Sequence, residues 1–147
     1  MSGRFKLDPR LAADTFLVGE TPLNQVLLMN DARYPWLILV PRRSNITEPF
    51  ELSETEQVQL WQESMRLGYV MKEHFGADKL NIAALGNQVA QLHVHHIVRF
   101  QVDAAWPGPV WGAGGAVPYR KAIREQLTRD LRRVLQQPLS LTETVHK

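Results

Sequence analysis

The chain has 147 residues, of which 44% are hydrophobic and 22% charged, and its formal net charge is +2. These values are typical of one soluble globular domain, and so small a net charge does not predict a nucleic-acid-binding surface. The chain has no cysteine, which excludes disulfides and thiolate metal sites. Residues 1–16 contain no apolar signal-peptide core, and the apolar run at 36–40 is too short to span a membrane. We therefore expect a cytoplasmic domain.

The first part of the chain predicts a short helix followed by buried strands. Asp8 and Pro9 are a typical helix start. Three short apolar runs, separated by polar and proline residues, then read as strands of one sheet at 16–20, 24–30 and 36–41.

A long helix is predicted over 53–76. Ser53 and Glu56 have the spacing of a capping box, and Gly76 is a typical helix end. Its apolar face is expected to contain Val58, Trp61 and Met65.

The second half of the chain predicts a β-hairpin, a covering loop and a last helix. Strands at 79–85 and 89–100 are separated by the turn-forming "GNQ". A loop rich in glycine, proline and tryptophan follows at 101–118, and a helix is expected at about 118–137. That helix has an apolar stripe of Ile123, Leu127, Leu131 and Val134, with its arginines expected in solvent. This order of elements predicts an α+β fold with helices packed on an antiparallel sheet of about five strands.

The stretch "QLHVHHIVRF" concentrates three histidines in one predicted strand. Alternate side chains of a strand share a face, so Gln91, His93 and His95 are expected on one side. His96 falls on the opposite, apolar side, where we interpret it as a structural residue.

Two imidazoles on one open face have two chemical uses. Neutral imidazole is a nucleophile, and a neighbouring ring can donate a proton to a phosphate oxygen. Imidazole is also a metal ligand, but a zinc site needs a third protein ligand. The remaining histidines, His74 and His146, are distant in sequence, so a metal site built with carboxylates stays as an alternative.

Three segments resemble the histidine triad (HIT) family. "GNQVAQLHVHHIVR" resembles its histidine motif, "VLLMNDARYPWLILVPRR" resembles a pair of its strands, and "LNIAALGN" resembles the strand that carries a nucleotide-contacting asparagine. The stretch "DAAWPGPVWG" resembles that of a bacterial subgroup of uncharacterised HIT proteins. The resemblance covers roughly residues 15–100 and implies a homodimer, and we expect a single HIT-like domain over 1–147.

The resemblance also implies chemistry at the α-phosphorus of a nucleoside phosphate or dinucleoside polyphosphate. We expect no cofactor, metal, membrane or nucleic-acid partner. The middle histidine of the motif, His93, would be the nucleophile, and His95 would donate to phosphate and leaving-group oxygens. The nucleotide-binding positions carried over are Asn30, Asp31, Asn81 and Asn87.

Two departures from the family pattern bear on turnover. Gln91 replaces the first histidine of the motif, and glutamine cannot carry a proton charge. Trp36 stands where many members have another histidine. Three hypotheses follow: a hydrolase or transferase that forms a nucleotidyl-histidine, a nucleotide-binding protein with weak or lost catalysis, and a metal-dependent hydrolase.

Overall fold

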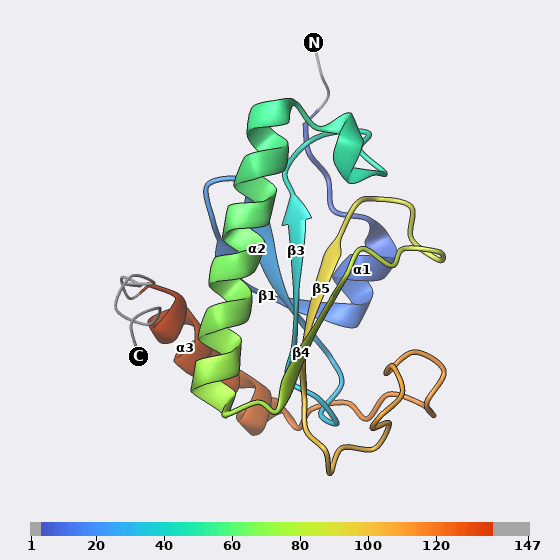
Figure 1. The fold of residues 1–147 in the computed structure, drawn as a ribbon, viewed down its shortest axis with the longest axis vertical. Coiled ribbons are helices and arrows are strands. Elements are labelled where there is room, and N and C mark those ends of the chain that lie inside the picture. Colours follow the sequence, from blue (N-terminus) through green and yellow to red (C-terminus); the bar gives the residue numbers. More distant parts are fainter. Residues whose placement is uncertain (1–3, 137–147) are drawn as a thin grey trace.

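The fold is a five-stranded antiparallel sheet with helices on both faces, which confirms the predicted α+β class (Figure 1). The structure, a computed structural model, describes residues 4–136, so Gln137 of the predicted last helix and His146 lie outside the described residues. The strands occur in the order β1-β2-β3-β5-β4. Their bounds are β1 Thr15–Glu20, β2 Asn24–Met29, β3 Trp36–Pro41, β4 Lys79–Ala83 and β5 Val94–Arg99. The helices are α1 Pro9–Asp14, α2 Glu54–Phe75 and α3 Lys121–Gln136, with a short 3-10 turn at Pro49–Glu51.

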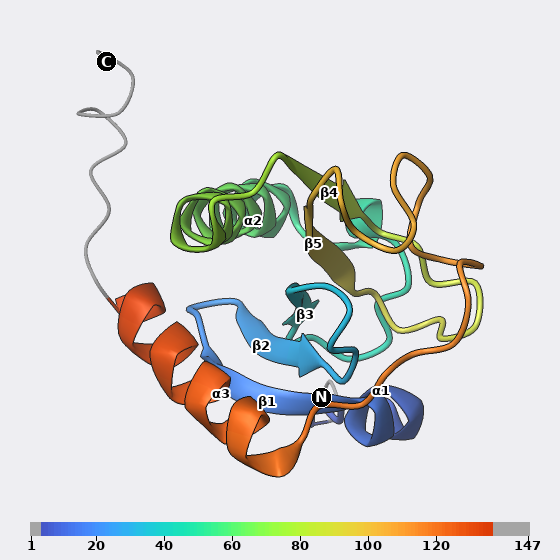
Figure 2. The ribbon, with the colours of Figure 1, turned by 90° about the horizontal axis from the view of Figure 1, so that it is seen from below.

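One face of the sheet is covered by α2 and α3. Figure 2 shows both helices on the same side of the curved sheet. Leu67 and Met71 of α2 and Leu131 of α3 share a buried cluster with strand residues Val18, Val26, Leu28, Leu37, Leu39 and Val98. No helix in the described part of the chain is long and apolar enough to cross a membrane.

The ends of α2 match the prediction, but its buried face does not. The Ser53 side chain accepts a hydrogen bond from the Glu56 amide, and Gly76 ends the helix at φ 63°, a conformation that favours glycine. Val58 and Trp61 are 58% and 63% exposed, so the predicted apolar face was wrong. The buried face includes polar and small residues, so the spacing of apolar residues does not detect it. Its members are Leu60, Glu63, Ser64, Leu67, Gly68, Val70 and Met71.

The other face of the sheet is covered by shorter pieces of chain. The N-terminal segment, α1 and the 101–118 loop lie across it, on the side opposite α2 and α3 (Figure 2). Leu11 of α1 and Val110 of the loop pack there with residues of β2 and β3. His93 and His95 lie on this face, beneath the covering segments.

The predicted hairpin pairs as expected but has a longer connection. β4 and β5 are antiparallel, with Ala83 opposite His95. β5 begins only at Val94, so Gln91 and His93 precede the strand within the connecting segment 84–93. The predicted strand start at residue 89 was therefore wrong.

The 101–118 loop and α3 are fixed by arginines. The buried Arg99 forms an ion pair with Asp103 at 2.8 Å, which holds the start of the loop. In α3, Arg132 donates to the Val18 carbonyl at 2.6 Å, and Arg124 lies 4.2 Å from the centroid of the Phe16 ring. These two arginines dock the helix on β1, whereas Arg120, Arg129 and Arg133 are exposed as expected.

Candidate active site

His93 has one ring nitrogen fixed by the backbone. Its side chain is only 5% exposed, and its Nδ1 lies 2.7 Å from the carbonyl oxygen of Gln91. A carbonyl oxygen only accepts, so Nδ1 carries the proton. In the neutral ring the free lone pair is then on Nε2, and no described residue forms a hydrogen bond to that atom. This is the tautomer that a nucleophile acting through Nε2 requires.

His95 has both ring nitrogens occupied. The indole N–H of Trp36 donates to Nδ1 at 3.0 Å, and Nε2 lies 2.9 Å from the carbonyl oxygen of Leu85. An indole N–H only donates and a carbonyl only accepts, so the proton is on Nε2 and the ring is neutral. Burial lowers the pKa of His95 to about 4, which favours the same neutral form.

The two imidazoles share one face, as predicted. Their ring centroids are 4.8 Å apart at an interplanar angle of 74°. Trp111 of the 101–118 loop lies 5.1 Å from the His95 ring and 5.9 Å from the Trp36 ring, both edge to face. The loop therefore covers the His95 end of the site with an aromatic wall.

The His93 end of the site opens onto a pocket of about 300 Å³. Glu48, Gly86 and Asn87 line it together with His93. A Cβ on Gly86 would lie 2.7 Å from the Val89 carbonyl oxygen and 3.1 Å from Cε1 of His93. Glycine at this position thus lets the connecting segment approach the imidazole closely.

Gln91 holds the His93 ring through its backbone carbonyl. The amide group instead binds the N-terminal segment, because Oε1 accepts from the Asp8 amide at 2.8 Å and Nε2 donates to the Lys6 carbonyl at 2.9 Å. Sequence reasoning missed this contact. No local pattern links residues that are more than eighty positions apart.

Asn30 and Asp31 fasten the chain that leads into α3. Asn30 Oδ1 accepts from the Tyr119 amide at 2.9 Å. The buried Asp31 forms an ion pair with Arg33 at 2.8 Å and accepts from the Val117 amide at 3.3 Å. Neither residue lines the His93 pocket.

Asn81 lies away from the pocket as well. It sits on β4 opposite Ile97, and its Oδ1 accepts from Arg99 Nη1 at 2.8 Å. Of the four predicted nucleotide-binding residues, the structure therefore brings only Asn87 to the pocket that His93 lines.

His96 points to the opposite face, as predicted. Its Nε2 lies 2.7 Å from the hydroxyl oxygen of Ser64 on α2, and the side chain is fully buried. Burial lowers the pKa of His96 to about 4. It joins β5 to α2 rather than contributing to the His93 pocket.

The metal hypothesis requires a third ligand beside His93 and His95. Between residues 4 and 136, no group of three or more His, Cys, Asp or Glu side chains is arranged to hold a metal ion. The two rings also have three of their four nitrogens in hydrogen bonds to protein atoms. Within the described chain, the site does not fit a metal centre.

The HIT domain family matches residues 10–102 of the chain. A crystal structure of a histidine triad protein from Marinobacter aquaeolei VT8 is 53% identical, with a TM-score of 0.89, over 92% of this chain and 98% of that one. One from Bradyrhizobium japonicum is 46% identical, with a TM-score of 0.88, over 90% of this chain and 99% of the other.

A hypothetical histidine triad nucleotide-binding protein from Sulfolobus tokodaii shares the fold at 20% identity, with a TM-score of 0.59, over 83% and 84% of the two chains. A search of curated proteins found no match. The family match covers most of the described chain, and this protein therefore belongs to the HIT domain family.

Proposed function

We propose that this protein is a nucleotide-binding hydrolase or transferase that acts at the α-phosphorus of a nucleoside phosphate derivative. The observation that carries the proposal is the tautomer of His93. Its Nδ1–H is held by the Gln91 carbonyl, which leaves the Nε2 lone pair for the substrate. The pocket beside it, about 300 Å³, offers Asn87 as a polar contact.

The proposed reaction has two displacements at phosphorus. Nε2 of His93 forms a P–N bond while the bond from phosphorus to the leaving group breaks, and the electron pair leaves with that group. Water then attacks the phosphorus, and the P–N electron pair returns to Nε2. The products are a nucleoside monophosphate and one proton released to solvent; a different acceptor in place of water gives transfer.

Trapping the intermediate tests the proposal. Purified protein is mixed with an adenosine and a guanosine polyphosphate, quenched within the first turnover and analysed by intact mass. A mass increase of one nucleotidyl group that is labile in acid is expected. His93→Ala should lose it, and His96→Ala, on the other face, should keep it. An adduct that persists in His93→Ala would contradict the assignment.

A nucleotide-binding protein with weak or lost catalysis is the second candidate. The occupied nitrogens of His95 favour it, because they leave that ring no free group to offer a substrate. Calorimetry with AMP and GMP separates the candidates: binding without an adduct would support the second. Absence of binding at millimolar concentration would contradict both.

We also propose that the protein forms a homodimer through the free edge of β4. β4 is an outer strand of the sheet, and Ile82 and Leu85 beside that edge are 37% and 39% exposed. An exposed strand edge with apolar side chains favours pairing with another chain. Sedimentation at micromolar concentration should give a dimer for the native chain and a monomer for Ile82→Lys. A native monomer would contradict the proposal.

A further inference from the structure

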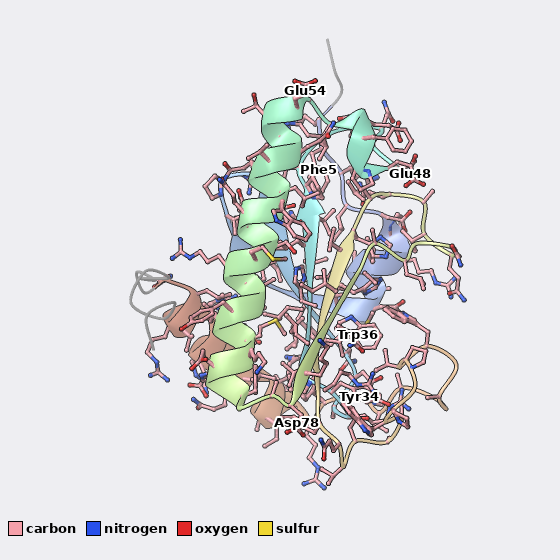
Figure 3. All side chains as sticks on the ribbon, in the orientation of Figure 1. Phe5, Tyr34, Trp36, Glu48, Glu54 and Asp78 are labelled. Atoms are coloured by element: carbon pink, nitrogen blue, oxygen red, sulfur yellow. The ribbon has the colours of Figure 1, made fainter. Side chains whose placement is uncertain are left out.

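A second pocket adjoins the one that His93 lines. It has a volume of about 300 Å³ and shares Thr47 and Gln91 with the His93 pocket. Its other lining residues are Arg4, Lys6, Ser44, Asn45 and Ile46. The two pockets are thus neighbours that share a wall at Thr47 and Gln91. In Figure 3, Phe5 of the N-terminal segment and Glu48 lie toward the same end of the molecule, and Trp36 lies further along.

The second pocket is positively charged. Arg4 and Lys6 both line it, and neither forms an ion pair or side-chain hydrogen bond with a described residue. Asn45 and the Ser44 and Thr47 hydroxyls also line the pocket, and the Thr47 hydroxyl donates to the Glu51 carboxylate at 2.7 Å. A guanidinium and an ammonium beside such groups suit a phosphate. Of the two pockets, Glu48 lines only the one at His93, so the charge of the lining changes from negative to positive past Gln91.

The side chain of Gln91 is bonded to the backbone of the segment that carries these cations. Its amide is hydrogen-bonded to the backbone on both sides of Leu7, at the Lys6 carbonyl and the Asp8 amide. The Asp8 carboxylate in turn accepts from the Arg10 amide at 2.8 Å and caps α1. The segment that carries Arg4 and Lys6 is therefore tied to the residue that also positions His93 through its carbonyl.

The state of His95 indicates which leaving group the site releases more readily. Its ring is neutral, with Nε2–H held by the Leu85 carbonyl and Nδ1 by the Trp36 indole. An amine must gain a proton as it leaves, which is slow without a general acid because the proton then comes from solvent. A phosphate-anhydride oxygen leaves as a stable anion and needs only electrostatic stabilisation, which cations supply.

We propose that the pocket of Arg4 and Lys6 is a subsite for the phosphates of an anionic leaving group, and that Gln91 is the positioning residue that assembles it. This inference rests on the proposed function of His93. When Nε2 of His93 displaces the leaving group from the α-phosphorus, the electron pair of the broken P–O bond stays on the departing phosphate. Arg4 and Lys6 stabilise that charge.

Two substrates with the same nucleotide test the subsite. One is an adenosine polyphosphate with an anionic leaving group, and the other is an adenosine 5′-phosphoramidate with an uncharged amine. Arg4→Ala/Lys6→Ala should lower kcat/KM for the polyphosphate by roughly 10- to 100-fold and change the phosphoramidate less than about 3-fold. Lys72→Ala/Lys121→Ala removes the same charge from exposed positions outside both pockets and should leave both substrates unchanged.

The outcome separates the subsite from the chemistry. Equal effects on the two substrates, or none on either, would overturn the subsite while leaving the role of His93 intact. Turnover of neither substrate by the native chain would count against the proposed function instead. Calorimetry with inorganic tripolyphosphate then tests phosphate binding at the subsite without the reaction. Binding that weakens at least 10-fold in Arg4→Ala/Lys6→Ala supports the subsite, and unchanged or absent binding overturns it.

Gln91→Leu tests the positioning role. Leucine keeps a similar volume but removes both hydrogen bonds to the N-terminal segment. The variant should weaken tripolyphosphate binding as the double variant does, while the phosphoramidate rate stays within about 3-fold, because the Gln91 carbonyl still holds His93. If turnover of both substrates falls together, or turnover of neither falls, Gln91 does not assemble the subsite.

Discussion

His93 and His95 are the same residue type on the same face of one segment, yet their surroundings differ in kind. His93 lines an open pocket and has a single ring nitrogen in a hydrogen bond. His95 lies under Trp111, with both nitrogens bound by Trp36 and Leu85. The first ring is free to react with a ligand, whereas the second is built into the wall of the site.

Spacing in the sequence determines on which face a side chain lies. The hydrogen-bond partners of that side chain then determine its chemistry. Both tautomers are set by groups that can act in only one sense: carbonyls that accept and an indole that donates. The alternation in "HVH" specifies neither partner. Four changes test the contrast, in order of decreasing expected effect.

Removing each ring in turn is the strongest test. His93→Ala should lower turnover by at least roughly 10⁴-fold, because the proposed nucleophile is lost. His95→Ala should lower it by less, on the order of 10²-fold, through loosening of the wall that supports His93. Steady-state rates on one adenosine polyphosphate measure both. Equal losses would mean that the two rings act as a chemical pair.

Acid acts on the enclosed rings His95 and His96, whose pKa values burial lowers from 6.5 to about 4. Between pH 6.5 and 4 the unfolded chain binds more protons than the folded one. The contribution of the two neutral rings to the free energy of unfolding is therefore complete above pH 6.5 and is lost as the pH falls toward 4. The full loss is roughly 3.5 kcal/mol for each ring, at about 1.4 kcal/mol per pKa unit, and roughly 2–3 kcal/mol of it occurs above pH 4.5.

Urea unfolding at pH 7, 6, 5 and 4.5 measures this loss. The pKa of Asp103, lowered to about 2 chiefly by its hydrogen bond to Arg99, places its titration below this window. A free energy of unfolding that stays level from pH 7 to 4.5 would show that the two rings become protonated without cost.

Gly86→Ala alters the open end alone. The added Cβ would lie too close to the Val89 carbonyl oxygen and within 3.1 Å of the His93 ring, so backbone or ring must shift. We expect turnover to fall roughly 10- to 100-fold, since a small misplacement of a reacting group has effects of this size. Gly115→Ala, where a Cβ has no heavy atom within 4 Å, is the matched control. Equal rates in the two variants would show that the close approach of Gly86 is not needed.

Much of the fold could be predicted because local patterns determine it. Ser53 and Gly76 signal the ends of α2 through capping chemistry, and the strand runs follow from apolar periodicity. The buried face of α2 escaped prediction, because Ser64 is buried against His96 and Trp61 stays exposed. Whether each of these side chains is buried depends on its tertiary partners, and the number of apolar residues along one helix gives no information about them.

The site was predictable in part for the same reason. The alternation placed His93 and His95 on one face and His96 on the other. The hydrogen bonds of Gln91 to the N-terminal segment join parts of the chain that are distant in sequence. The placement of Asn30 depends likewise on Tyr119, almost ninety residues further along the chain. Single-sequence reasoning has no signal for such pairings.

Trp36→Phe tests the enclosed end with the smallest expected effect. Phenylalanine keeps an apolar ring near Trp111 but removes the N–H that donates to Nδ1 of His95. The neutral imidazole loses a hydrogen bond that favours it, so the pKa of His95 should rise from about 4 toward 6.5. Leaving a buried acceptor unpaired should cost roughly 1–3 kcal/mol of stability. Turnover should change less than about 3-fold, because the lost contact lies on the ring that we place in the wall. NMR titration of the histidine rings and steady-state kinetics measure the two effects. A rate loss as large as that of His93→Ala would break the contrast between the two imidazoles, since it would make the Trp36–His95 pair part of the chemistry.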